Sequence, residues 1–165
     1  MTYQVTFETL PKNLTEMKAL PQAALSNPED TAALTIAALC VYPTDKAAAI
    51  EMLDFLRGPR PLSPYEQQFI RDRFMDGQDF IPRSYFGGAT PDNDYTPALP
   101  LTLTFSDSAS EIAEDGYKKL DIRSGGADTP RSVMLRLKPS TRQWFLWEQY
   151  LLSQIRTQKS ADPWA

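Results

Sequence analysis

Histidine is absent from the 165 residues of this chain, and cysteine occurs once, as Cys40. Without histidine there is no imidazole to act as a base near neutral pH, which excludes a Ser–His–Asp triad, a Cys–His pair and a His-ligated metal. One cysteine excludes an internal disulfide and fits a reducing compartment. Because Cys40 lies in the apolar run TIAALCVYP, we predict a small core residue rather than a reactive thiol.

Long apolar runs and targeting signals are also absent from the sequence. No stretch approaches the ~18 apolar residues of a membrane-spanning helix. The start, MTYQVTFETLPKNLTEMK, does not have the basic segment followed by an apolar one that marks a signal peptide. We therefore expect a cytoplasmic protein that does not bind membranes.

Charged residues are present in ordinary amount but are unevenly distributed. The net charge of −4 argues against a general nucleic-acid binder. Residues 71–116 carry a net charge of −6, whereas residues 117–142 carry +5. The basic stretch is either the solvated face of a sheet or an electropositive surface for an acidic partner.

The order of hydrophobic patterns predicts an α+β fold in a single domain of residues 1–165. Residues 1–77 read as a mainly helical half, 78–97 as a long crossover loop, 98–153 as an antiparallel sheet half and 154–165 as a tail. After a short edge strand at Tyr3–Phe7 and a short helix at Thr15–Leu20, three helices are expected. They begin after the caps Asn27, Thr44 and Ser63, and end at Pro43, Gly58 and Gly77.

Two side-chain patterns indicate which faces are buried. In the helix after Ser63, which opens with a Ser-Pro-x-Glu capping box, we expect the pairs Tyr65–Phe69 and Ile70–Phe74 to face the core. Clean alternation predicts half-buried strands in LPLTLTFSDS, YKKLDIRS and SVMLRLK, arranged as an antiparallel meander. The next strand, RQWFLWEQY, is apolar on both faces and should be central or covered. We expect Trp164, in the polar tail, to dock onto the body.

The crossover IPRSYFGGATPDNDYTP could be a site or a packed connection. Gly87 and Gly88 could present backbone N–H groups to an anion, but a phosphate loop needs a following helix and usually a lysine, and both are missing here. Asp92 and Asp94 do not fit a Ca²⁺ loop, because the twelfth position is Leu103. We therefore favour a packed crossover anchored by the aromatic residues Phe80, Tyr85, Phe86 and Tyr95.

The turn RSGGADTPRS, residues 123–132, has two interpretations as well. Arg123 and Arg131 flank the Gly125–Gly126 pair and could hold a carboxylate or phosphate. The alternative, which we favour, is an ion pair between Asp128 and an arginine that braces the turn. If this turn meets the 81–97 crossover in space, the two loops are where function is expected.

Three segments, YFGGATP, SGGADTPR and WFLWE, resemble motifs of an uncharacterised bacterial domain family found mainly in Gram-positive anaerobes. The likeness covers most of the chain, and the family has no activity that it could imply. The residues that this resemblance places in the shared motifs are Tyr85, Gly87 (the variable position before Gly88), Thr90, Pro91, Asp128, Pro130, Arg131, Trp144 and Trp147. The expected architecture also resembles the cone-shaped nuclear-transport-factor-like fold, which hosts enzymes and binding modules alike.

Our first functional hypothesis is a non-enzymatic binding or protein-interaction module. It would have no cofactor, metal or nucleic acid, and its partner would be a protein or a small acidic ligand. The expected surface combines the 81–97 loop, the 123–131 turn and the basic sheet face, and its residues are Tyr85, Gly87, Gly88, Arg123, Asp128, Arg131 and Trp147. The alternative is a ligand pocket or a His-independent enzyme lined by Tyr85, Asp128, Arg131 and Trp147. A structural subunit of a larger assembly is a third hypothesis.

Overall fold

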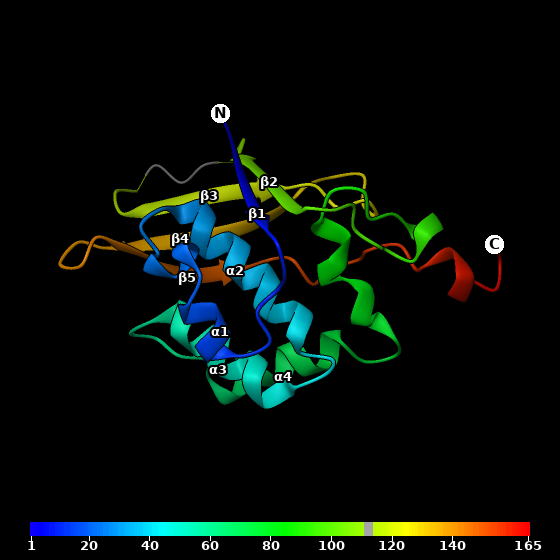
Figure 1. Cartoon of the computed structure of the whole chain (residues 1–165), viewed down its shortest axis with the longest axis horizontal. Helices are drawn as coiled ribbons and strands as arrows, with labels where there is room; N and C mark the ends of the chain where they lie inside the picture. The colour runs from blue at the N-terminus through cyan, green and yellow to red at the C-terminus, as the bar shows by residue number, and fades with distance from the viewer. Residues whose placement is uncertain (111–113) are drawn as a thin grey trace.

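The computed structural model of the chain describes residues 1–110 and 114–165. In these residues a five-stranded antiparallel sheet forms one layer, and helices pack against it from below in the view of Figure 1. The predicted α+β class is confirmed. No helix in the described ranges is long and apolar enough to cross a membrane.

The strands stand in the sheet in chain order, so the predicted meander is confirmed. Alternate residues of the inner strands are buried, among them Leu103 and Phe105, and Val133 and Leu135, because one face of the sheet packs on the core. The strands are β1 Thr2–Phe7, β2 Leu101–Asp107, β3 Tyr117–Ile122, β4 Arg131–Lys138 and β5 Gln143–Gln149.

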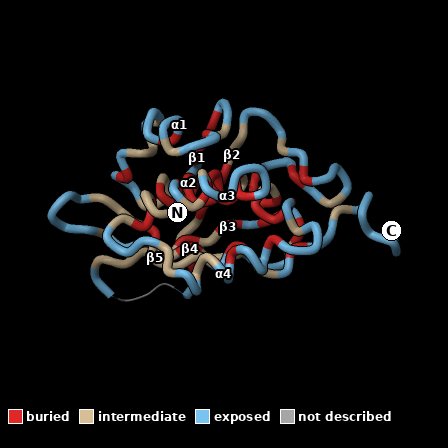
Figure 2. The backbone as a smooth tube through the Cα atoms, turned by 90° about the horizontal axis from the view of Figure 1, so that it is seen from below, coloured by how far each residue is buried: buried red, intermediate tan, exposed pale blue. Residues whose placement is uncertain are grey.

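Helix α2, Pro28–Val41, is the centre of the core. It contacts β1, β3, β4 and β5 on one side and α3, Lys46–Arg57, on the other. Alanines along the helix allow this close approach from two sides. Figure 2 shows that the buried segments gather in the middle of the molecule, with exposed backbone around them. Cys40 packs against this core as predicted, and burial raises the pKa of its thiol to about 12.

The helix ends follow the predicted positions with two corrections, and Asn27 stands at the N-cap of α2 without a capping hydrogen bond from its side chain. Asp45, not Thr44, caps α3 by accepting the Ala48 N–H at 3.1 Å, because the Thr44 hydroxyl donates to Val41 at the end of α2. The Ser63–Glu66 capping box opens α4, Pro64–Arg73, but this helix stops before Gly77. Phe74 ends it, with its ring stacked on Tyr42 at 4.7 Å. The remaining α-helix is α1, Leu14–Lys18.

One pair of residues expected in the core lies on the surface. Tyr65 is 79% exposed and Phe69 39%, whereas Ile70 and Phe74 are buried as predicted. Helix α4 therefore covers the core with a single narrow stripe, and its other aromatic residues stand at the rim of a cavity.

The crossover packs onto the body as predicted. Its four aromatic anchors are buried, and the rings of Phe80 and Tyr95 stack at 5.1 Å. Backbone polar groups are satisfied locally in three short 3₁₀ turns, Gln78–Phe80, Pro82–Tyr85 and Pro91–Asn93.

Strand β5 is covered but not central. It is an edge strand, and its free edge is occupied by other segments of the chain. The Trp144 N–H donates to the Leu25 carbonyl at 2.8 Å, and the Trp144 carbonyl accepts the Thr31 hydroxyl at 2.6 Å. These bonds occupy backbone groups that another strand would need for pairing.

The tail does not dock through its tryptophan. Trp164 is 92% exposed, so the predicted docking is wrong. The tail is held by polar contacts instead, in which Lys159 lies 3.7 Å from Asp92 and the Ser160 hydroxyl donates to Asp94. Its short 3₁₀ turn is Lys159–Ala161.

Candidate functional site

The crossover and the 123–131 turn meet in space. The Gly125 N–H donates to the Ser84 carbonyl at 2.9 Å, and the hydroxyl of Ser124 donates to that of Ser84 at 2.7 Å. A Cβ at Gly125 would lie 1.9 Å from the carbonyl oxygen of Ala89, so this close approach requires glycine. Beside the junction lies a cavity of about 360 Å³ whose lining includes Gly87, Gly88, Thr102, Thr104 and Arg123.

The polar groups at this junction are already used by the fold. The Ser84 hydroxyl donates to Ile81 at 2.6 Å, and the Ser124 hydroxyl accepts the Gly126 N–H at 3.0 Å. Tyr85 is only 3% exposed, and its hydroxyl donates to the Leu151 carbonyl. Tyr85 therefore lies in the core rather than on a binding surface.

Two charged residues of the 123–131 turn, Asp128 and Arg131, bond to neighbouring segments. Arg131 donates to the carbonyls of Thr129, Ser153 and Gln154 at 2.8–3.2 Å. Asp128 forms the predicted ion pair, with Arg156 as its partner at 3.0 Å. Arg123 is exposed, and among the described residues its side chain has no hydrogen-bond or ion-pair partner.

The four residues expected to line one pocket do not come together. Tyr85 borders the cavity at the loop junction, whereas Trp147 borders a different groove, lined by β4, β5 and residues 57–60. Asp128 is exposed, and Arg131 is bonded to loop carbonyls. Trp147 is the one of the four whose surroundings remain open for binding.

A β-bulge places the Trp147 side chain. Met134 of β4 is opposite Glu148, while the next residue, Leu135, is opposite Leu146, so Trp147 is the extra residue of β5. Such a bulge re-aims a side chain and disturbs the ladder. Here it brings the indole to the Tyr117 ring, at 5.6 Å edge to face.

Two guanidinium groups stack on this indole. Arg60 lies 3.8 Å and Arg136 lies 4.7 Å from the centre of the Trp147 ring. Arg60 also donates to the Trp147 carbonyl at 2.6 Å and lies 3.6 Å from Glu148. Stacked guanidinium groups keep their edge N–H donors free to bind carboxylates.

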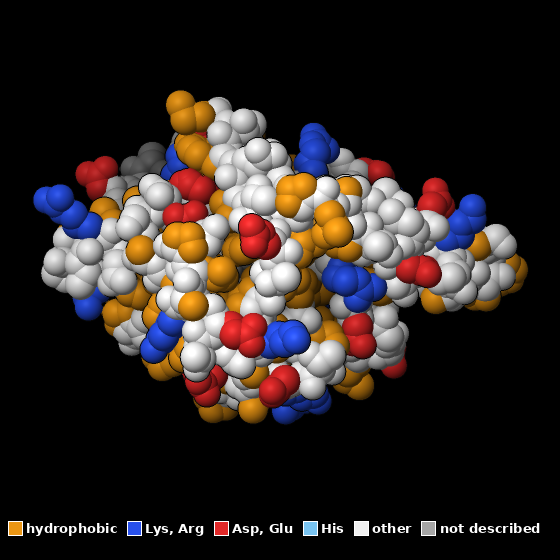
Figure 3. All heavy atoms as spheres, viewed as in Figure 1, with side chains coloured by type: hydrophobic (Ala, Val, Ile, Leu, Met, Phe, Trp, Pro, Cys, Tyr) orange, Lys and Arg blue, Asp and Glu red, His pale blue; other side chains and the backbone are white. Residues whose placement is uncertain are grey.

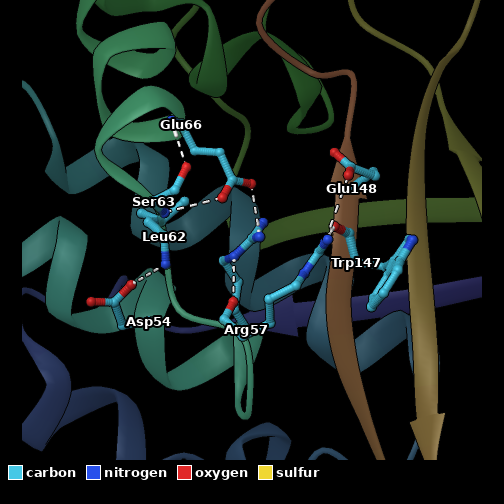
Figure 4. A network of polar contacts seen from close by, with 8 residues as sticks. Asp54, Arg57, Leu62, Ser63, Glu66, Trp147 and Glu148 are labelled. Carbon is cyan, nitrogen blue, oxygen red and sulfur yellow. Dashed lines mark hydrogen bonds and ion pairs between the residues drawn. The ribbon is translucent and has the colours of Figure 1, made fainter.

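Polar contacts of Asp54, Arg57 and Glu66 fix the connection from α3 to α4, which carries Arg60 (Figure 4). Arg57, whose side chain is 4% exposed, forms a 2.7 Å ion pair with Glu66 and donates from Nε to the Arg60 carbonyl at 2.9 Å. Asp54 accepts the Leu62 N–H at 2.8 Å, which secures the other side of the connection. A Cβ at Gly58 would lie 2.5 Å from the Phe145 ring, so the loop is pressed against β5.

Both partners of the ion pair are charged near neutral pH. Burial lowers the pKa of the Arg57 guanidinium, and the charge of Glu66 opposes that shift. Burial pushes the pKa of Glu66 upward, but the Ser63 N–H and the Arg57 charge outweigh it and hold this pKa below its ordinary value. The pair therefore acts as a fixed clamp on the Arg60 loop.

The groove beside Trp147 has a volume of about 360 Å³ and combines an apolar floor with positive charge. The charged residues that line it are all basic: Arg57, Arg60, Arg136 and Lys138. Its apolar lining consists of Pro59, Leu137, Pro139, Phe145, Leu146 and Trp147. Among the described residues, the side chains of Arg136 and Lys138 have no carboxylate partner.

A second cavity of about 240 Å³ adjoins this groove, because Arg57 and Leu146 line both. It is mainly apolar and includes Glu66 and Glu148. The exposed aromatic residues Tyr65, Phe69 and Tyr150 stand in its lining.

The sequence indicated part of this site. The basic stretch at 117–142 includes Arg136 and Lys138, and the tryptophan pair drew attention to Trp147. Nothing in the sequence pattern indicated Arg60, because it lies in the turn GPRP, far in sequence from the Trp147 ring on which it stacks. In the described part of the chain no group of three or more His, Cys, Asp or Glu side chains could hold a metal.

The comparison with protein families agrees with the resemblance seen in the motifs. A family described as a domain of unknown function, DUF6935, matches residues 9–159. The chain belongs to this family. No curated protein and no solved structure matches it. The likeness to the nuclear-transport-factor-like fold therefore stays a prediction.

Proposed function

We propose that this DUF6935 domain is a non-enzymatic, cytoplasmic interaction module that binds an acidic segment of a partner protein in the groove beside Trp147. The observation that carries the proposal is the lining of that groove. Every charged side chain in it is basic, although the chain as a whole has a net charge of −4. A segment with carboxylates beside an apolar side chain complements both the charge and the floor.

The positive side chains are available to such a partner. Arg136 and Lys138 are exposed and, in the described ranges, are not neutralised by a carboxylate. Arg60 is shared with Glu148, but both side chains are more than 40% exposed, so this ion pair is weak. A partner carboxylate can therefore bind the guanidinium edges without breaking a strong internal contact.

The shape of the surface supports a peptide segment rather than a strand added to the sheet. The Trp144 and Trp147 backbone groups at the edge of β5 are occupied by Leu25, Thr31 and Arg60, which disfavours pairing with an incoming strand. The two adjoining cavities can each receive an apolar side chain of one segment. We therefore expect recognition through side chains.

Calorimetric titration with an end-blocked peptide, Asp-Leu-Glu-Asp-Leu-Glu, tests the proposal. Arg136→Gln should raise the Kd about five- to tenfold, equivalent to about 1–1.4 kcal/mol, and high salt should weaken binding to the wild type. Arg123→Gln is the matched control, because it removes an exposed, unpaired guanidinium from the loop junction. The absence of binding to the wild type, or an equal loss in both variants, would overturn the proposal.

A further inference from the structure

The tail presents an acidic side chain and an uncovered indole in one turn. The Trp164 N–H donates to the Asp162 carboxylate at 2.8 Å, and the Ala165 N–H donates to the Asp162 carbonyl at 3.2 Å. These bonds hold Trp164 outward, where it is the most exposed large apolar side chain of the described residues, at 92%. A large aromatic side chain left in solvent is available for contact with another molecule.

The turn matches the groove beside Trp147 in chemistry. The Asp162 carboxylate complements Arg136 and Lys138, which have no carboxylate partner among the described residues. The Trp164 indole complements the apolar floor of Phe145 and Leu146, and its ring can stack on a guanidinium face as the Trp147 ring does. The occupant required by the groove is thus present in the chain itself.

The two surfaces of one molecule are far apart. The tail lies beside the Pro91–Asn93 turn of the crossover, to which Lys159 and Ser160 attach it. The groove includes Lys138 and Pro139 at the turn between β4 and β5. Figure 1 places this turn and the C-terminus at opposite ends of the molecule, and Figure 3 shows the tail as a projection.

We infer that the Asp162–Trp164 turn of one copy binds in the groove beside Trp147 of a second copy. This inference rests on the proposed function, because it names the acidic segment that the groove receives. The contact joins two different surfaces, so it is head-to-tail and leaves one tail and one groove open at the ends of each dimer. Association should therefore increase continuously with protein concentration rather than stop at a dimer.

Sedimentation velocity of the whole chain from micromolar to millimolar concentration tests the inference. The wild type should associate, and either Trp164→Ala or Arg136→Gln should leave a monomer. Leu99→Ala, which removes another exposed apolar side chain that lines neither of the two cavities, should associate like the wild type. Mixing the Trp164→Ala and Arg136→Gln proteins should give a 1:1 dimer and nothing larger, because only one intact tail and one intact groove can meet.

The outcomes separate this inference from the proposed function. A wild-type chain that stays monomeric, or variants that associate unchanged, would overturn the inference even if the acidic peptide binds. A mixture of the two variants that remains monomeric would also refute the head-to-tail contact. If calorimetry detects no peptide binding to the wild type, and Arg136→Gln associates as the wild type does, both the inference and the proposed function are overturned.

Discussion

Removing the charge of Glu66 should destabilise the protein more than removing the buried charge of Arg57. Glu66→Gln keeps a side chain that can close the capping box but leaves the Arg57 guanidinium, 4% exposed, without its ion-pair partner. Breaking a buried pair from one side costs about 3–5 kcal/mol. Because the Glu66 side chain is 30% exposed, water reduces that cost, and we expect about 2–3 kcal/mol.

The opposite change should cost less. Arg57→Met removes the buried charge, leaves Glu66 partly hydrated and loses the hydrogen bond to the Arg60 carbonyl, for about 1 kcal/mol. The double variant should then cost about as much as Arg57→Met alone, so the coupling between the two positions is about 2 kcal/mol. Urea unfolding followed by circular dichroism near neutral pH measures all four proteins.

Glu51→Gln is the control for this cycle, because Glu51 is exposed on α3 and should change stability by no more than about 0.5 kcal/mol. Equal costs for the two single variants, with an additive double variant, would refute the account of Arg57 and Glu66 as a buried clamp on the Arg60 loop.

Three further predictions concern the clamp, the loop junction and the core. The difference in stability between the wild type and Glu66→Gln should be largest above the ordinary pKa of glutamate. It should shrink as pH falls through the lowered pKa of folded Glu66. Urea unfolding at several pH values that showed a constant difference would contradict this. Gly125→Ala should lower stability by about 2 kcal/mol or more, because its Cβ would meet the Ala89 carbonyl. Gly87→Ala, whose added Cβ would have its nearest neighbour 3.8 Å away, should be tolerated in the same urea unfolding assay, and equal losses for the two variants would refute the junction geometry. The Cys40 thiol, with its pKa raised to about 12, should react slowly with Ellman's reagent at mildly alkaline pH until urea unfolds the protein. Rapid labelling of the folded chain would show that the thiol is not buried.

Local patterns predicted those parts of the fold that local physics decides. Alternation in β2, β3 and β4 matches a sheet with one buried face, and the Ser63–Glu66 capping box marks the start of α4 because both of its hydrogen bonds are local. Distant segments decide what such local patterns leave open. Four consecutive apolar residues predicted that β5 is central or covered, and it is covered, because Leu25, helix α2 and the Arg60 loop bond to its free edge.

The candidate site was less predictable than the fold for the same reason. The pattern of glycines and aromatic residues left open whether the two loops meet, and it did not show that their polar groups would bond to one another. Trp147 was singled out as a tryptophan that could line a surface. Its guanidinium neighbours depend on a β-bulge and on a loop from another part of the chain, neither of which has a sequence signature.

The most direct test of the central claim is a map of amide chemical-shift changes on titrating the ¹⁵N-labelled chain with the Asp-Leu-Glu-Asp-Leu-Glu peptide. The account predicts that the changes concentrate in residues 57–60, 136–139 and 145–148, and that the Trp147 indole N–H shifts with them. Changes concentrated in residues 84–90 and 123–126, or no change at saturating peptide, would contradict the assignment of the groove beside Trp147 as the binding site.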